Sequence, residues 1–148
     1  MLTYRSDPGG MKYPPRPLLI IGFVYLVASL THFVHNAEFI DEYPNLPAWL
    51  ARSDVYLAWA ATLIPCVLAY WAWARGREAW AFGLFAAWSA LGFLGLDHYY
   101  IAPVSAHSKS AIFTIFFELL AGAGLLAVSI FYLVKSCAGR KRLAHGEP

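Results

Sequence analysis

Two histidines and a glutamate follow closely on one another at the end of an apolar run. His32 and His35 are three residues apart, and Glu38 follows after the same interval. In a helix, side chains three residues apart point within about 60° of each other, so both imidazoles can reach one site. Imidazole and carboxylate groups are ligands for zinc, iron, copper or manganese, and they are also general acids and bases. The stretch is therefore a candidate site for metal or proton chemistry.

A second set of ionisable residues lies later in the chain. Asp97 and His98 are adjacent, His107 lies in the turn that follows, and Glu118 stands within an apolar run with no cation beside it. Ionisable side chains inside a membrane segment cost several kcal/mol unless they have partners or water, which makes them functional candidates by default.

The segments that must position these residues are apolar and long. The chain has 148 residues, of which 59% are hydrophobic and 14% charged, too apolar a composition for a soluble domain of this size. About 20 apolar residues cross a hydrocarbon core of about 30 Å. We predict an all-α integral membrane protein, an up-and-down antiparallel bundle of four transmembrane helices. The predicted spans are residues 17–36, 54–74, 80–100 and 108–135.

Basic residues predict the orientation of this bundle. Only Arg52 and Lys109 flank the ends on one side, whereas the other nine lysines and arginines flank the ends on the opposite side. The positive-inside rule then places both termini in the cytoplasm of a cell with the protein in its inner, or plasma, membrane. The net charge of +2 needs no nucleic-acid partner. Residues 1–16 form a disordered cytoplasmic lead and residues 136–148 a basic cytoplasmic tail in this prediction.

Prolines and small residues predict where the helices end, bend or pack closely. Pro44 and Pro47 prevent a regular helix between the first two spans, so we expect a short interfacial lid there on the outer side. Pro65 predicts a kink in the second span. The small residues of the third span, such as Gly92 and Gly95, predict close helix packing, either within one chain or in a homo-oligomer.

Depth along the helices is a test of whether the polar residues meet. A count from Leu18 places His32 about 21 Å along the first helix, roughly 9 Å below the outer boundary of the core. The same count in the fourth helix places Glu118 roughly 10 Å below that boundary, and the third helix brings Asp97 and His98 within about 5 Å of it. We expect one pocket open to the outside, with His32 and Glu118 at its floor.

This pocket predicts a metal-binding membrane protein, in the simplest case a small metalloenzyme. The metal would be a transition ion such as zinc, iron or copper, and the substrate a small or lipidic molecule from the surrounding membrane lipid. Glu118 or Glu38 would act as general base. A structural explanation competes with this hypothesis, because Glu118 can also be protonated and bonded to Thr114. The predicted metal ligands are His32, His35, Asp97, His98, His107 and Glu118.

Three other functions fit the same residues. A b-type haem protein would use His32 or His35 with His98 as axial ligands. A proton-coupled small transporter would use the carboxylates as carriers, although the inner half of the spans offers no ionisable residue below Glu118. A lipid- or sterol-binding protein would protonate its substrate. His35 and Glu38, about one helical turn apart, resemble the His and Glu of the EXPERA group of sterol isomerase-like proteins, and this two-residue resemblance implies such acid–base chemistry.

Overall fold

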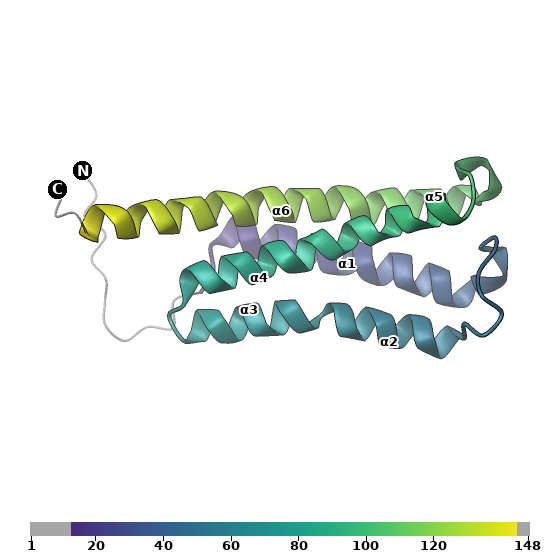
Figure 1. Ribbon diagram of the computed structural model, residues 1–148, viewed down its shortest axis with the longest axis horizontal. Coiled ribbons are helices and arrows are strands. Elements are labelled where there is room, and N and C mark those ends of the chain that lie inside the picture. The colour runs from purple at the N-terminus through teal and green to yellow at the C-terminus, as the bar shows by residue number, and fades with distance from the viewer. Residues whose placement is uncertain (1–12, 145–148) are drawn as a thin grey trace.

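The fold consists of helices that lie side by side along one axis (Figure 1). The computed structural model describes residues 13–144, with side chains to residue 139, and this range contains helices and no strand. The lead before residue 13 and His145 of the basic tail lie outside it. The elements are α1 (Arg16–Glu38), η1 (Ile40–Glu42), α2 (Arg52–Thr62), α3 (Ile64–Ala74), α4 (Glu78–Ala90), η2 (Leu91–Asp97), α5 (His98–Ile101), η3 (Val104–Ala106) and α6 (Lys109–Ala144).

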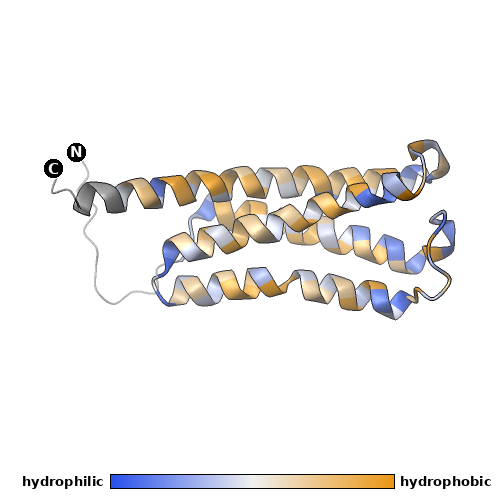
Figure 2. Ribbon diagram, in the orientation of Figure 1, coloured by the Kyte–Doolittle hydropathy of each residue, from blue (hydrophilic) through white to orange (hydrophobic). Residues whose placement is uncertain are grey.

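Four helical stretches are long and apolar enough to cross a membrane, and they match the four predicted spans. They are Arg16–Glu38, Arg52–Ala74, Glu78–Ile101 and Lys109–Gly139. Their middle parts are hydrophobic, and hydrophilic residues gather near the helix ends (Figure 2). Large apolar side chains such as Phe23, Leu57 and Leu120 are about two-thirds exposed. A surface of this kind suits hydrocarbon better than water.

The fourth helix is longer than the sequence predicted. The prediction ended this helix at Lys135, where the apolar run ends, but α6 continues to Ala144. A hydropathy pattern marks where a helix leaves hydrocarbon, whereas the helix itself continues as long as its residues favour it. Alanine, lysine, arginine and leucine, which are frequent after Lys135, all have high helix propensity.

The second span changes its neighbour at its midpoint. It is interrupted at Leu63, two residues before Pro65, because proline has no N–H to give to the preceding turn. The half before the break, α2, packs on α1, whereas the half after it, α3, packs on α4 (Figure 1). The predicted kink is therefore present, and α2 is directed away from the third span.

The third span changes from an α-helix to a thinner 3₁₀ helix where it passes α1. It is α-helical to Ala90 and then continues as the tighter 3₁₀ helix η2. Two glycines permit the close approach at this point. A Cβ on Gly92 would lie 2.8 Å from the Tyr25 ring, and a Cβ on Gly95 would lie 3.1 Å from Cε1 of His32. These glycines fulfil the predicted packing role within the chain.

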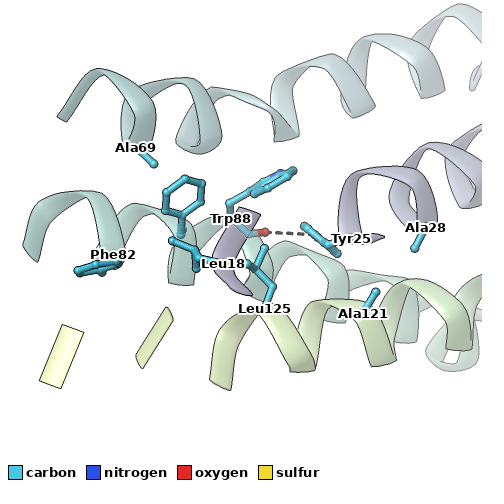
Figure 3. Packing of buried hydrophobic residues seen from close by; sticks show 9 residues of the cluster. Leu18, Tyr25, Ala28, Ala69, Phe82, Trp88, Ala121 and Leu125 are labelled. Carbon is cyan, nitrogen blue, oxygen red and sulfur yellow. Dashed lines mark hydrogen bonds between the residues drawn. The ribbon is translucent and has the colours of Figure 1, made fainter. Parts of the chain in front are cut away.

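The main apolar core lies on one side of this crossing. It includes Leu18, Phe82, Trp88 and Leu125, which interdigitate between α1, α4 and α6 (Figure 3). Tyr25 belongs to the same cluster: its hydroxyl donates to the Trp88 carbonyl at 3.1 Å, and the two rings meet edge to face at 4.9 Å. We call this region the aromatic half. The other part of the bundle, which contains His32, His35, His98, His107 and Glu118, is the histidine half.

Candidate functional site

A histidine and a glutamate join α1 to α6 in the centre of the histidine half. His32 Nδ1 and Glu118 Oε2 are in direct hydrogen-bonding contact. Each residue is only 2% exposed. The two side chains therefore meet, as the sequence predicted from their positions along the two helices. A carboxylate at Nδ1 fixes the orientation of an imidazole and leaves its Nε2 for other chemistry, as in other carboxylate–histidine pairs.

Asn36 occupies the other side of this imidazole. It lies one helical turn after His32, and its Nδ2 is 3.0 Å from His32 Nε2 and 3.3 Å from His98 Nε2. An amide nitrogen carries two N–H groups, so Asn36 can donate one to each neutral imidazole. The amide oxygen of Asn36 is buried and has no hydrogen-bond partner among the described residues. Asn36 was not among the predicted site residues, although its spacing of four from His32 places both on one helix face.

Tyr43 covers the histidines from the segment between α1 and α2. It is 4% exposed, and its ring centroid lies 5.0 Å from that of His98 and 6.3 Å from that of His107. Its hydroxyl is 2.8 Å from His35 Nδ1. Burial raises the pKa of this hydroxyl above its ordinary value, so the phenol stays protonated and can donate to His35.

The segment that carries Tyr43 is tied to the end of the third span. Asn45, which has a positive φ of 59°, donates from Nδ2 to the Ile101 carbonyl at 3.2 Å. The segment therefore lies as a lid across this end of the bundle, in agreement with the lid expected from its two prolines. Tyr43 was not among the predicted site residues, and the sequence alone gave no sign that its ring turns inward.

His98, which is half-buried, and His107, which is buried, complete the group. The ring centroid of His98 lies 5.5 Å from that of His32 and 6.1 Å from that of His107. His107 Nδ1 donates to the Pro103 carbonyl at 3.1 Å, which leaves Nε2 as its acceptor. Three imidazoles from three different parts of the chain thus lie in sequence from the lid to Glu118.

Two predicted site residues lie outside this group. Asp97 is exposed, because residues adjacent in a helix point about 100° apart and His98 takes the inward direction. Glu38 is also on the surface, where its carboxylate pairs with Arg52 at 3.2 Å and accepts from the Tyr56 hydroxyl at 2.8 Å. This contact links the ends of α1 and α2 and takes Glu38 away from Glu118.

Residues 13–139, whose side chains the structure describes, include no group of three or more His, Cys, Asp or Glu arranged to hold a metal ion. His32 uses Nδ1 for Glu118, and His35 is directed to Tyr43. The predicted ligands are therefore partly brought together, as His32, His98, His107 and Glu118, but their nitrogen and oxygen atoms do not converge on one point. The haem and transporter alternatives stay predictions.

Comparisons with protein-family models, curated proteins and solved structures give no significant match. The class that the fold and the buried polar group define is a four-span helical protein of membrane-like composition with an internal carboxylate–histidine pair. The carboxylate–histidine pair and the residues around it are the features that bear on its function.

Proposed function

We propose that this chain is an up-and-down membrane bundle whose Glu118–His32 pair transfers protons to and from a small lipidic molecule. The histidine half faces the outside of the cell, and both termini are cytoplasmic, as the basic residues predict. The observation that carries the proposal is the direct contact of Glu118 with His32 in a wall of a cavity. A buried pair that only linked two helices would need no cavity beside it.

The pair has the parts that acid–base chemistry requires. Glu118 accepts the Nδ1–H of His32, so Nε2 is the basic nitrogen of the imidazole, which can take a proton from a substrate and return it. Glu118 fixes the imidazole through Nδ1, and His32 Nε2 becomes available when the Asn36 amide moves aside. Apolar surroundings strengthen the hydrogen bonds of the acid and the base, because water does not compete for these bonds. Reactions that need only a proton added at one place and removed at another, such as isomerisations, fit a site of this kind.

Deuterium incorporation tests the proposal without knowledge of the substrate. The protein is placed in vesicles made from the lipids of its host membrane, incubated in D₂O, and the lipids are extracted and returned to H₂O before mass spectrometry. Only deuterium bound to carbon then remains. We expect one lipid class to gain deuterium far faster than in empty vesicles.

Variants of the pair and a matched control complete this experiment. Glu118→Gln and His32→Gln keep the size of the side chains and should lower the rate at least about a hundredfold, the usual contribution of a positioned acid or base. Glu38→Gln changes the surface glutamate and should leave the rate unchanged. Equal incorporation in wild type, the pair variants and empty vesicles would refute the proposal.

A metal site is the second candidate, and one contact favours it. His32 Nε2 and His98 Nε2 both contact the same atom, Asn36 Nδ2. If the amide turned away, two imidazole nitrogens would face the place that it left, and neutral imidazole is a common ligand of zinc, iron and copper. Elemental analysis of protein purified without chelator should then show about one metal ion per chain, lost in His98→Ala. Absence of metal from the wild type would exclude this candidate.

A further inference from the structure

A cavity of about 240 Å³ lies between α2 and η2, beside the Glu118–His32 pair. It occupies the space left where α2 turns away from the third span at Leu63. One end is polar and is formed by His32, Asn36, His98 and Glu118. The side walls are mostly apolar and include Phe33, Val55, Ala58, Leu91 and Leu94, with Asp54 and Thr62 as their polar members. A cavity with a polar end and apolar walls matches an amphiphile with its head group inside.

The walls indicate that the entrance faces the lipid. Ala58 on α2 and Leu94 on η2 line the cavity and are also exposed on the surface of the bundle, with Leu94 at 56%. The lid carrying Tyr43 covers the histidines at the end of the bundle. The exposed wall residues lie within the spans Arg52–Ala74 and Glu78–Ile101. A molecule therefore reaches the polar end sideways, between α2 and η2, from within the membrane.

The charges around the cavity select an uncharged head group. Among the residues that line it there is no lysine or arginine, whereas Asp54 contributes a carboxylate at one edge. An anionic head group would meet two carboxylates, Asp54 and Glu118, and no cation to compensate for its lost hydration. Asp54 also caps α2 by accepting from the Ala51 N–H at 2.9 Å, and the positive end of the helix dipole there opposes a cation.

The orphaned oxygen of Asn36 identifies the head group more closely. It is buried, has no partner among the described residues, and belongs to a residue that lines the cavity. A buried acceptor without a donor is costly, and a hydroxyl group would supply the missing donor. The cavity is smaller than the sites of about 300 to 1,000 Å³ that enclose whole drug-sized ligands. It can therefore hold a head group and the first carbons while the remaining chain lies in the lipid.

We propose that the cavity binds an uncharged amphiphile with a hydroxyl head group, which enters from the membrane between α2 and η2 and donates to Asn36. This inference names the substrate class of the proton-transfer site and in that respect rests on the proposed function. The binding itself does not depend on proton transfer and is tested separately.

Photolabelling tests the proposal directly. The full-length protein in lipid nanodiscs is exposed to a long-chain alcohol that carries a diazirine close to its hydroxyl, or to the carboxylic acid and quaternary ammonium of the same chain. Adducts are located by mass spectrometry of peptides. We expect the alcohol to label cavity residues of α2 and η2 in a saturable manner, and the two charged probes to label only lipid-facing surface. Labelling of the cavity by the acid or the ammonium as strongly as by the alcohol would overturn the assignment.

Two matched substitutions locate the entrance. Ala58→Trp fills the opening from α2 and should reduce cavity labelling to background, whereas Leu57→Trp adds the same ring at the neighbouring, lipid-facing position and should leave it unchanged. Asn36→Leu removes the acceptor at nearly constant size and should weaken labelling about fivefold, the effect of one hydrogen bond. Circular dichroism and thermal unfolding verify that the variants fold. Equal labelling of the Ala58 and Leu57 variants would refute lateral entry.

The two assays separate the two proposals. Cavity labelling by the alcohol without deuterium incorporation in the wild type would leave the binding site established and reject proton transfer. Deuterium incorporation without cavity labelling would reject the hydroxyl amphiphile and retain the acid–base pair.

Discussion

The two halves of the bundle share α1 and α6 but are packed in opposite ways. In the aromatic half, Leu18 and Leu125 are at most 1% exposed and large rings fill the space between α1, α4 and α6. In the histidine half, α2 separates from the third span, a cavity remains, and the buried side chains include the polar residues His32, His107 and Glu118. The comparison teaches that one part of the molecule is packed around large apolar side chains, while the other retains a cavity beside the Glu118–His32 pair.

The crossing of α1 and η2 separates the two halves. Gly92 faces Tyr25 on the aromatic side, and Gly95 faces His32 on the histidine side. Because α1 and α6 continue through both halves, a substitution in one half can affect stability while a substitution in the other half affects the site. Substitutions on the two sides of this crossing therefore test whether stability and function are separated in the molecule.

The largest effect on stability is expected from breaking the buried pair. Glu118→Leu or His32→Leu leaves the partner buried and alone, and we expect a loss of about 3 to 5 kcal/mol in the free energy of unfolding. Replacing both residues with leucine removes both polar groups, so the double variant should regain most of this stability. Equilibrium unfolding in mixed micelles measures the free energy of unfolding of the three variants and the wild type. Additive losses in the double variant would show that the two side chains do not act as a pair.

The next largest effect on stability is expected from a substitution in the aromatic half, and it should leave the site unchanged. Leu125→Ala creates a cavity at a fully buried position, and we expect it to cost about 2 to 5 kcal/mol. Thermal unfolding in nanodiscs measures this loss. Deuterium incorporation per folded molecule should be unchanged, because Leu125 is not among the residues that line the cavity. A parallel loss of incorporation would contradict the separation of the two halves.

A smaller effect is expected at the crossing itself. Gly95→Ala brings a methyl group to 3.1 Å from His32 Cε1, so the imidazole must shift by a few tenths of an ångström. We expect a loss of about 1 kcal/mol in stability with a several-fold loss of deuterium incorporation, since the ring of His32 is displaced. Gly83→Ala is the control, because a Cβ there meets nothing within 4 Å. Identical behaviour of the two variants would show that His32 is not closely held.

The smallest effect is expected from the lid. Tyr43→Phe removes one hydrogen bond to His35, at a cost of about 1 kcal/mol. The pKa of Tyr43 is raised in the folded protein, so its contribution is constant below the ordinary value of 10.0 and falls as the pH rises above it. Unfolding measured from neutral to strongly alkaline pH should show this fall in the wild type and a smaller one in the variant. An identical pH profile for both proteins would exclude Tyr43 as its source.

Much of the fold was predictable because hydropathy and helix breakers act locally. The four spans follow from apolar length, and the break at Leu63 follows from Pro65. The contact of His32 with Glu118 was predictable from depth, since both residues lie at similar distances from the end of their helices. The rise per residue is the same in every α-helix, so depth transfers from sequence to structure.

The remaining part of the site depended on tertiary packing. Asp97 and His98 are equally plausible from sequence, and only the rotation of η2 determines that His98 turns inward. Glu38 was drawn to Arg52 and Tyr56 by the approach of α2, which sequence spacing does not reveal. Tyr43 turns inward because its segment is attached to Ile101, far away in the chain. Contacts of this kind depend on how helices and connecting segments pack against one another, and the spacing of residues in the sequence does not determine that packing.

The most direct test of the central claim is deuterium incorporation per folded molecule in two matched variants, Glu118→Gln and Leu125→Ala, beside the wild type. If the histidine half performs proton transfer and the aromatic half supplies stability, Glu118→Gln should lose incorporation at least about a hundredfold while it remains folded, and Leu125→Ala should retain it at reduced stability. Wild-type incorporation in Glu118→Gln, or incorporation no greater than in empty vesicles for all three proteins, would contradict the account.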